Sequence, residues 1–374
     1  MFLGLKKPQK GYSLFAGTFQ QAPMNFSPSR RPATIHDVAK AVGMSKSTVS
    51  AALLGRGRQS EETRELVQRE AEKLGYQADF FAQGLRKKRN DLVSFFSPDL
   101  DLGVSTLKMH AIWGLLDARG YTVPVLSYGN RLGGHFVEQE KLLAELRRQK
   151  PRAMICNTSN LQTEAAQSEL RRYLEEGGQA VCYDWELRVE TDAVIFDRQH
   201  NTFTATQHLL ERGHRKIGIG LPRSSQMSGP RMEGFERALG QWNLGIRPEW
   251  ILQGEQTFYF ELDGAALAQQ FLALRERPTA MAIVNDHVAS AFAVCLGRAG
   301  VRVPDDVSLV SHDNFPIAEL GPFQLSTVSN PIAQIAEAVV EMLDSRLTGR
   351  YEGPPRRKVI RGELFERGSV VAPR

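Results

Sequence analysis

Regular hydrophobic spacing first occurs between residues 34 and 75. One segment repeats apolar side chains at the three- and four-residue spacing of a single helical face: Ile35, Val38, Ala39 and Val42. Thr34 is an N-cap candidate, with Asp37 three residues further on in the manner of a capping box. Gly43 supplies the left-handed residue that commonly ends a helix. The pattern therefore predicts a helix over residues 35–42.

Two further helices are predicted directly behind the first. Ser45 begins the second after a very short turn, and three of its residues can pack inward: Val49, Ala52 and Leu53. Ser60 begins the third, which ends at Gly75 and whose apolar side is formed by Leu66, Val67, Ala71 and Leu74. Two short helices joined so tightly form a helix-turn-helix. The same caps and breaks occur in any small helical hairpin, so the spacing alone leaves both interpretations open.

The outer face of the second predicted helix carries the candidate chemistry of this region. It presents one cation and three hydroxyl groups: Lys46, Ser47, Thr48 and Ser50. Short donors and acceptors of this kind can reach base edges in a DNA major groove, and a lysine can contact a phosphate.

Beyond residue 91, short apolar strands alternate with helices, which is typical of a parallel α/β fold. Strands are predicted at residues 92–96, 121–126, 153–156, 180–183, 193–196, 216–220, 250–253, 280–284 and 307–311. Helices are predicted at residues 106–118, 138–148, 201–212, 231–242, 262–275 and 288–299. The elements up to residue 220 form one series and those from residue 231 form a second. The predicted fold class is therefore α/β, with a small all-α headpiece and a two-lobed core whose ligands lie beyond the carboxyl ends of the strands.

Charge is distributed unevenly along the chain. Residues 1–30 hold four basic side chains and no acid, and residues 31–90 hold twelve Lys/Arg against seven Asp/Glu, which gives +5. The remainder has 31 basic against 35 acidic residues and is therefore at −4, within a total of +5. The basic end is the end that a polyanion would contact. A bias of this size is also common on solvated surfaces, so it supports the motif without establishing a partner.

Residues 1–32 show no sustained period and are predicted to form a flexible N-terminal extension. They lack the apolar core and cleavage site of a secretory signal, and no later segment has a transmembrane-length apolar run. Cys156, Cys182 and Cys295 are isolated and lack metal-ligand spacing, so we expect small core residues in a reducing cytoplasm. The sequence thus predicts a cytoplasmic protein without membrane attachment, metal or cofactor.

The sequence from Thr34 to about Lys88 resembles the headpiece of the LacI/GalR family of bacterial transcription regulators. The stretches that carry the resemblance are TIHDVAKAVGMSKSTVS and GRGRQSEETRELVQREAEKLGYQADFFAQGLRKKR. The resemblance implies a periplasmic-binding-protein-like core and a homodimer, usually a repressor, on double-stranded operator DNA of pseudo-palindromic sequence. It also implies a small-molecule effector, with a carbohydrate as the first expectation and a purine-like ligand as the second. We accordingly predict a headpiece at residues 33–78, a hinge helix and linker at 79–90, and an effector-binding and dimerisation domain at 91–374.

The resemblance assigns a set of DNA-binding residues. Leu85 matches the hinge leucine that wedges between base pairs in the minor groove, and wedges of this kind kink the duplex. Gly84 stands where a helix-forming residue is usual and should weaken the hinge helix by ~1 kcal/mol. A basic linker between domains is the alternative interpretation of this segment. The full set is Thr34, Lys46, Ser47, Thr48, Ser50, Ala51, Arg58, Ala82, Leu85 and Arg86.

The resemblance also assigns candidate effector-binding residues. Arg231 begins an Arg-x-x-Gly-Phe motif whose arginine holds an anionic or polyhydroxylated ligand. Asn285 and Asp313 match ligand positions after strands of the second lobe, and Ser97 and Asp184 follow strands of the first. Asp and Asn after strands are also ordinary turn residues, and Arg231 could be a surface residue at the start of a helix.

Two departures from the family pattern leave the effector and the operator sequence open. Residues 102–105 read Leu-Gly-Val-Ser where the family has an aromatic Asn-Pro-Phe-Phe-like segment, and Phe258, Tyr259 or Phe260 could supply the aromatic contact instead. Ala51 stands where arginine is frequent in the recognition helix. Base readout would then depend on the small polar residues around it and on Arg58.

Other functions have weaker support. No nucleotide-binding fingerprint, nucleophile elbow or Walker lysine motif occurs, and His208 and His214 fit a helix end better than a metal site. Asp184 and Asp313 could form an acid/base pair, but catalysis gives the headpiece no purpose, so we predict no catalytic residue. The remaining alternatives are a small-molecule-binding protein without DNA specificity and a general architectural DNA binder.

Overall fold

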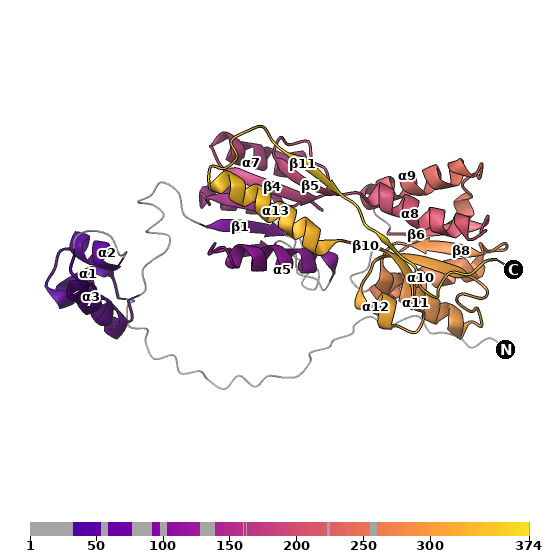
Figure 1. The fold of residues 1–374 in the computed structure, drawn as a ribbon, viewed down its shortest axis with the longest axis horizontal. Helices are drawn as coiled ribbons and strands as arrows, with labels where there is room; N and C mark the ends of the chain where they lie inside the picture. Colours follow the sequence, from indigo (N-terminus) through magenta and orange to yellow (C-terminus); the bar gives the residue numbers. More distant parts are fainter. Residues whose placement is uncertain are drawn as a thin grey trace. The chain divides into compact units, whose positions relative to one another are not determined.

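The protein divides into two compact units, with the boundary between Gln83 and Gly84. The computed structural model describes residues 33–53, 59–76, 92–97, 103–127, 139–159, 161, 163–222, 225–254 and 260–373. The described part of the first unit holds three helices: α1 (Ile35–Val42), α2 (Lys46–Leu53) and α3 (Glu61–Leu74). The second unit holds two parallel α/β lobes (Figure 1). The predicted extension and hinge, residues 1–32 and 79–90, lie outside the described residues.

Local capping sets the three helices of the headpiece as predicted. Asp37 accepts hydrogen bonds from the backbone N–H and the hydroxyl of Thr34, at 2.8 and 2.7 Å, and Gly43 ends α1 at a φ of 66°. The hydroxyl oxygen of Ser45 accepts from the N–H of Thr48 at 3.1 Å and so starts α2. The small core holds six buried residues: Val38, Ala39, Val49, Ala52, Val67 and Ala71.

The prediction of which α3 residues are buried is correct for two of the four. Val67 and Ala71 are buried, but Leu66 and Leu74 are 39% and 41% exposed. The two leucines lie at the edges of the helical face, and a core of six residues built largely from Ala and Val is too small to cover both edges.

The first lobe, called the N lobe, is built around a six-stranded parallel sheet in the order β11-β5-β4-β3-β1-β2. Its strands are β1 (Val93–Ser97), β2 (Val125–Ser127), β3 (Ala153–Asn157), β4 (Gln179–Asp184), β5 (Asp192–Phe196) and β11 (Arg357–Ile360). Its helices are α5 (Val104–Asp117), α6 (Gln139–Arg148), α7 (Glu164–Glu175) and α13 (Ile332–Leu347). α5 and α13 pack in one core cluster with the sheet, and α6 and α7 pack in another.

The second lobe, called the C lobe, has a sheet in the order β12-β10-β9-β8-β6-β7, parallel except for β12. Its strands are β6 (Ile217–Leu221), β7 (Ile251–Gln253), β8 (Ala280–Ile283), β9 (Ser308–Asp313), β10 (Ser326–Ser329) and β12 (Leu364–Phe365). Its helices are α8 (Arg198–Glu211), α9 (Ser225–Gln241), the 3-10 turn η1 (Pro248–Trp250), α10 (Phe260–Ala273), α11 (Asp286–Arg298) and α12 (Pro316–Leu320). α8 and α9 contribute to one core cluster, and α10 and α11 to the other.

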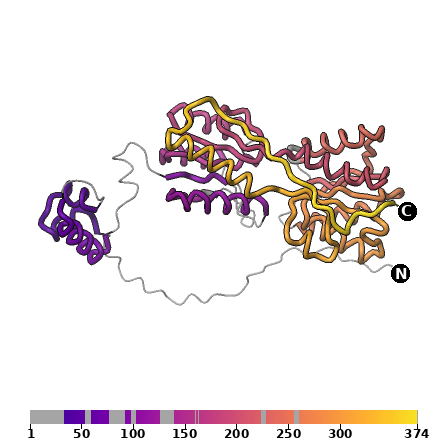
Figure 2. Tube along the Cα trace, in the orientation of Figure 1, coloured from indigo at the N-terminus to yellow at the C-terminus, as the bar shows by residue number. Residues whose placement is uncertain are grey.

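The lobes are not the two consecutive series that the sequence pattern predicts. The chain enters the C lobe after β5, so α8 and β6 belong to the second lobe rather than to the first. It returns to the N lobe after β10 to form α13 and β11, and then passes back to form β12, as the yellow end of the tube in Figure 2 shows. The prediction was wrong at this point because strand order depends on long-range pairing, which a local hydrophobic period does not encode.

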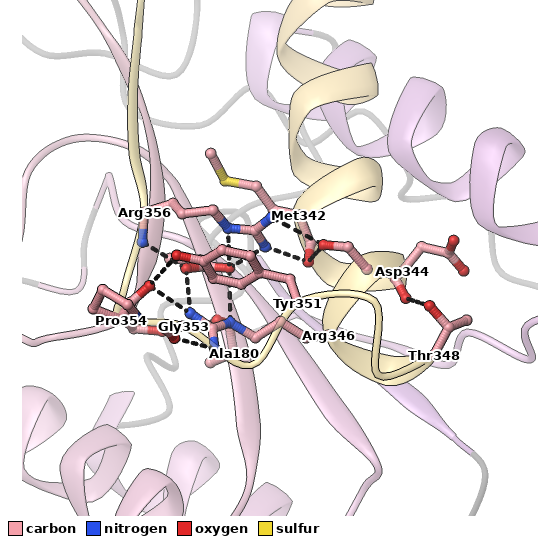
Figure 3. A network of polar contacts seen from close by, with 12 residues as sticks. Ala180, Met342, Asp344, Arg346, Thr348, Tyr351, Gly353, Pro354 and Arg356 are labelled. Carbon is pink, nitrogen blue, oxygen red and sulfur yellow. Dashed lines mark hydrogen bonds and ion pairs between the residues drawn. The ribbon is translucent and has the colours of Figure 1, made fainter.

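A buried ionic cluster holds the returning segment in the N lobe. Asp192, at the start of β5, is fully buried and receives hydrogen bonds from Arg346 on α13 at 2.8 and 2.9 Å. Arg356, just before β11, donates to the same carboxylate at 2.6 Å. Figure 3 shows Tyr351 beside both guanidinium groups, whose central carbons lie 5.0 and 4.0 Å from its ring centre. The cluster fixes the loop from α13 to β11, and with it the segments that join the lobes.

Candidate functional site

The exposed side of α2 is the candidate DNA-binding surface. Lys46 and Ser47 are exposed at its first turn, whereas Thr48, Ser50 and Ala51 are partly buried. The hydroxyl of Ser45 lies 2.7 Å from that of Ser47 and 2.8 Å from that of Thr48. The start of α2 therefore presents a cluster of hydroxyl groups next to a lysine, while Arg58, Ala82, Leu85 and Arg86 fall outside the described residues.

A cleft of about 250 Å³ lies where the carboxyl ends of strands from both lobes meet. Asp184 after β4, Asn285 after β8 and Asp313 after β9 line it. Their φ angles of 101°, 99° and 98° lie in a region that side-chain-bearing residues rarely adopt. Backbone strain of this kind persists where the surrounding structure enforces it, and it clusters at ligand sites.

On the N-lobe side, Asp184 is surrounded by hydrogen-bond donors. The Lys108 ammonium contacts its Oδ1 at 2.5 Å, and Arg198 contacts its Oδ2 at 2.8 Å and its backbone carbonyl at 3.0 Å. The Ser159 hydroxyl also donates to Oδ2, at 2.9 Å. Lys108 and Asp184 are 1% and 3% exposed, so this is a buried charge cluster.

Burial and charge act in opposite directions on Asp184. Burial alone would raise the pKa of this carboxyl, but Arg198 and Lys108 hold the pKa well below its usual range. Burial lowers the pKa of the Lys108 ammonium, and Asp184 opposes that shift. Asp184 is therefore an anion that two cations share.

Aromatic rings support the two cations that contact Asp184. The Arg198 guanidinium lies 3.8 Å from the centre of the Trp185 indole and 5.2 Å from the Phe196 ring. The Lys108 ammonium lies 4.8 Å from the same Phe196 ring. Stacking on π-faces fixes the direction in which these cations point.

The C-lobe wall is built from a carboxylate and amides. Asp313 accepts from the Asn285 side chain at 3.0 Å and from the Asn330 side chain at 3.2 Å. The other end of the Asn285 amide accepts from the first N–H groups of α11, at 2.9 and 3.3 Å. Asn285 therefore caps a helix and also lines the cleft. The structural role at a turn and the predicted place at a ligand site are both compatible with this position.

Arg231 projects from α9 into the same cleft. Burial and the nearby Arg198 lower its pKa to about 9, against the attraction of Asp313 and Asp184. Its guanidinium carbon lies 5.9 Å from the Trp185 ring centre, so Arg231 and Arg198 border the same indole. It is not a simple surface residue at the start of a helix, because α9 begins six positions earlier, at Ser225.

A second carboxylate is buried beneath the C-lobe wall. Asp286 accepts from the hydroxyls of Ser311 and Thr327, at 2.5 and 2.8 Å, and from the N–H of Phe315 at 2.6 Å. Burial, assisted by Asp313, raises the pKa of Asp286 to about 7.

The structure brings most of the predicted effector residues together. Asp184, Arg231, Asn285 and Asp313 line the cleft, and so does Phe260, which was one of the three aromatic candidates. Phe258 and Tyr259 fall outside the described residues. Ser97 is fully buried at the end of β1 and is not among the residues that line the cleft.

The lining residues that sequence reasoning missed include Lys108, Trp185, Arg198 and Asn330. A signal existed for two of them. Lys108 shares the i, i+4, i+8 stripe of Ile112 and Leu116, where only apolar side chains are expected. Arg198 is the first residue of α8, and a cation there opposes the helix dipole unless it has another partner.

Two kinds of feature are absent from the described residues. Within them, no group of three or more His, Cys, Asp or Glu side chains could hold a metal ion. No helix there combines the length and the apolar composition that crossing a bilayer requires.

Comparisons with known proteins match both units. A family model described as "Bacterial regulatory proteins, lacI family" matches residues 34–79, and one described as "Periplasmic binding protein-like domain" matches residues 206–370. The chain is 29% identical over 343 residues to the HTH-type transcriptional repressor PurR of Proteus mirabilis (strain HI4320), covering 91% of this chain and 97% of that protein.

Solved structures agree in fold. A lac repressor dimer bound to operator and the anti-inducer ONPF superimposes with a TM-score of 0.76 at 23% identity, and a complex of the regulator CelR with cellobiose does so with 0.65 at 24%. Each alignment covers 91% of this chain and 100% of the other. The matched families are regulators and not enzymes. The chain belongs to the LacI family of transcriptional regulators, with a helix-turn-helix headpiece and a periplasmic-binding-protein-like effector domain.

Proposed function

We propose that the protein is a cytoplasmic repressor that binds a pseudo-palindromic operator as a homodimer and responds to a sugar or sugar derivative in its cleft. The observation that carries the proposal is the lining of the cleft. Arg231 and the Asn285–Asp313–Asn330 cluster converge on it from different elements of the C lobe. The guanidinium group of Arg231 offers several N–H donors, and the Asp313 carboxylate lies between two amides. Such a set of donors and acceptors suits a ligand with several hydroxyl groups.

The size of the cleft limits the effector. At about 250 Å³ it is below the usual range of drug-sized ligand pockets, so a monosaccharide-sized molecule fits better than a larger one. Phe260 and Trp185 offer apolar faces beside the polar groups. The CelR complex with cellobiose supports a carbohydrate ligand for this fold. A purine-like effector is the second candidate.

DNA recognition is assigned to α2 and to the hinge sequence. Lys46 and Ser47 are exposed for phosphate or base contact. Ser50, Thr48 and Ala51 complete the recognition face, and Thr34 lies at the start of α1. Arg58, Ala82, Leu85 and Arg86 remain assignments from the sequence, with Leu85 as the minor-groove wedge.

Dimerisation is supported by two exposed apolar residues of α5. Leu107 and Trp113 are 41% and 46% exposed, although both are large apolar side chains. Burial of such residues against a second copy would add apolar contact area. Ligand binding would then alter how the lobes sit and how far apart the paired hinges lie, and DNA binding would reciprocally alter ligand affinity.

The direct test is selection of bound genomic DNA fragments by the purified protein at near-physiological salt. We expect recovery of one pseudo-palindrome, whose neighbouring genes then nominate effectors for titration. Uniform recovery of all fragments would favour the alternative, a small-molecule-binding protein without regulatory DNA specificity.

A matched pair of lysines sharpens the test. Lys46→Gln should weaken operator binding about tenfold and reduce the salt slope by about one, because one phosphate contact is lost. Lys73→Gln makes the same charge change on α3, where the lysine pairs with Glu70, and should change binding less than twofold. Equal losses in the two variants would contradict the assignment of α2 to DNA.

A further inference from the structure

Within the described residues, the chain crosses between the two lobes three times. Asp197 is the first crossover, between β5 and α8, and residues 330–331 are the second, between β10 and α13. Residues 361–363 are the third, between β11 and β12. Because each lobe is a packed sheet with helices, a change in the angle between the lobes requires rotation about backbone bonds in these crossovers. The contacts among the crossovers therefore determine how easily the lobes move.

Hydrogen bonds join the third crossover to the other two. The Asp197 N–H donates to the Ile360 carbonyl oxygen at 2.9 Å, and the Asp197 carboxylate accepts from Arg361 at 3.1 Å. The Ser329 N–H donates to the Glu363 carbonyl oxygen at 2.8 Å, and the Glu363 N–H donates to the Ser329 hydroxyl at 3.0 Å. These bonds form two pairs of segments, the first with the third and the second with the third.

A single residue, Asn201 on α8, contacts all three crossovers. Its backbone N–H donates to the carbonyl oxygen of Asp197 at 3.1 Å, and its side chain is buried, with the residue 1% exposed. The side-chain oxygen accepts from the Gly362 N–H at 2.9 Å. The side-chain nitrogen donates to the Ser329 carbonyl oxygen at a longer 3.4 Å. A side-chain amide can accept at one end and donate at the other, so Asn201 binds the second and third crossovers at once.

Gly362 is matched to this arrangement by its lack of a side chain. A Cβ atom at this position would lie 2.0 Å from the Ser329 carbonyl oxygen and 2.8 Å from the side-chain nitrogen of Asn201. Both distances are shorter than a real Cβ contact, so any side chain at position 362 would push the second and third crossovers apart. Glycine allows this close approach of two backbone segments.

The same contacts reach the cleft. Asn330 follows Ser329 directly, and its side chain and its backbone N–H both donate to Asp313, each at 3.2 Å. Asn201, Asn330 and Asp313 all line the cleft. A change at the C-lobe wall is therefore adjacent in the chain to the carbonyl group that the Asn201 amide contacts.

We propose that Asn201 is a positioning residue that holds the three lobe crossovers as one cooperative unit, the crossover clamp, through which a change at the cleft acts on the angle between the lobes. The crossover clamp consists of Asp197, Asn201, Ser329 and residues 361–363. The inference goes beyond the proposed function, because it concerns how the lobes are held whichever effector binds. Coupling between distant sites requires an element of this kind, which both sites can bias.

Hydrogen–deuterium exchange of the full-length protein tests the clamp, with fragmentation that resolves single amides. In Asn201→Ala we expect the amides of Gly362, Asp197 and Ser329 to exchange about tenfold faster than in the natural protein. The last two amides donate to Ile360 and Glu363 rather than to Asn201, so their acceleration reports cooperativity. Acceleration confined to Gly362 would overturn the inference, because Asn201 would then only satisfy one buried N–H group.

Two further variants perturb the clamp without changing Asn201. Ser329→Ala removes the hydroxyl that accepts from Glu363, and we expect the Asp197 and Gly362 amides to exchange about threefold faster. Asn330→Ala removes the side-chain contact to Asp313 at the cleft, and the Gly362 amide should again exchange about threefold faster. Unchanged exchange at Gly362 in the second variant would contradict the connection between the cleft and the clamp.

Controls separate the clamp from general loss of structure. Glu211→Ala changes an exposed residue of the same helix α8 and should leave every clamp amide unchanged. The amides of Ile155 in β3 and Ala282 in β8 report the two lobe cores, and their exchange should be the same in all variants and in the natural protein. If these core amides accelerate as much as Asp197 and Gly362 do, the substitutions act on folding as a whole and the inference is wrong.

Discussion

Each wall of the cleft has a carboxylate buried in or beneath it, but the two lobes surround that carboxylate with different partners. At the end of β4 in the N lobe, Asp184 is held by two cations, Lys108 on α5 and Arg198 at the start of α8. In the C lobe, Asp286 is held by two hydroxyls and a backbone N–H. The pKa values separate accordingly, because the cations hold the pKa of Asp184 well below its usual range while burial raises that of Asp286 to about 7.

The difference shows that similar strand-end geometry can serve two purposes. Asp184, Asn285 and Asp313 share nearly the same positive φ at the carboxyl ends of their strands. At β4 this geometry places a carboxylate between two cations, whereas at β8 and β9 it places a carboxylate beside amides. Three predictions test this contrast.

The largest expected effect is at Asp184. Asp184→Asn removes the anion that Lys108 and Arg198 share and leaves two buried cations uncompensated, which typically costs about 3–5 kcal/mol. The melting temperature of the core should fall by roughly 5–10 °C. Glu164→Gln, which removes an exposed acid paired with Arg171, should leave the melting temperature unchanged.

A second substitution tests the reason for that loss. Adding Lys108→Met to Asp184→Asn removes one of the uncompensated cations and restores an apolar residue to the inner stripe of α5. The double variant should therefore be more stable than Asp184→Asn alone, and a double-mutant cycle gives the coupling. Additive losses would show that the buried pair is not what stabilises this wall.

An effect of intermediate size is expected at Asp286. An acid whose pKa is higher in the folded protein than in the unfolded chain destabilises the fold when it ionises, so its contribution worsens as the pH rises from about 4 towards 7. Asp286→Asn removes this titration. The unfolding free energy of the variant relative to the natural protein should rise by about 2 kcal/mol between pH 5 and pH 7 and level off above that.

The control for this prediction is the shape of the pH profile. Asparagine pairs imperfectly with three donors, but that penalty does not depend on pH. Urea titrations across the range therefore separate the two contributions, and a difference that stays constant from pH 5 to pH 8 would contradict the raised pKa of Asp286.

The sequence predicted the three headpiece helices and their ends because the determinants of these ends are local. Thr34, Gly43, Ser45 and Gly75 fix helix ends through contacts within a few residues. The strand-end residues of the C lobe were predictable for a related reason, since strands and their turns show in the hydrophobic pattern. The assignment of elements to lobes could not be predicted. The strand β11 pairs with β5, and the helix α13 packs on the same sheet, although both lie more than 130 residues beyond β5 in the chain.

The charged wall of the N lobe could not be predicted from local pattern. Lys108 and Asp184 are 76 positions apart, and a lysine in a helix is ordinarily solvated. Only the packing of α5 against the sheet buries it and brings its ammonium to the end of β4. The buried ionic cluster of the N lobe could not be predicted for the same reason. Asp192 pairs there with Arg346 and Arg356, which Figure 3 labels and which lie more than 150 positions further along the chain.

The smallest effect, and the most direct comparison of the lobes, comes from two serines. Ser159→Ala removes a hydroxyl from Asp184, and Ser311→Ala removes one from Asp286. Because two cations still neutralise Asp184, the first change should cost only about 0.5 kcal/mol, whereas the second removes one of three neutral donors and should cost about 1–2 kcal/mol when Asp286 is ionised.

The pH dependence of the two serine variants should also differ. Ser311→Ala raises the pKa of Asp286 further, so its cost should be larger at pH 8 than at pH 5, where the carboxyl is protonated in either protein. The cost of Ser159→Ala should be the same at both values, because Asp184 stays ionised throughout. Parallel urea titrations of the two variants measure both quantities. Equal costs with equal pH dependence would mean that cations and hydroxyls stabilise these carboxylates alike, and the contrast between the walls would then lie in the exposed residues of the cleft alone.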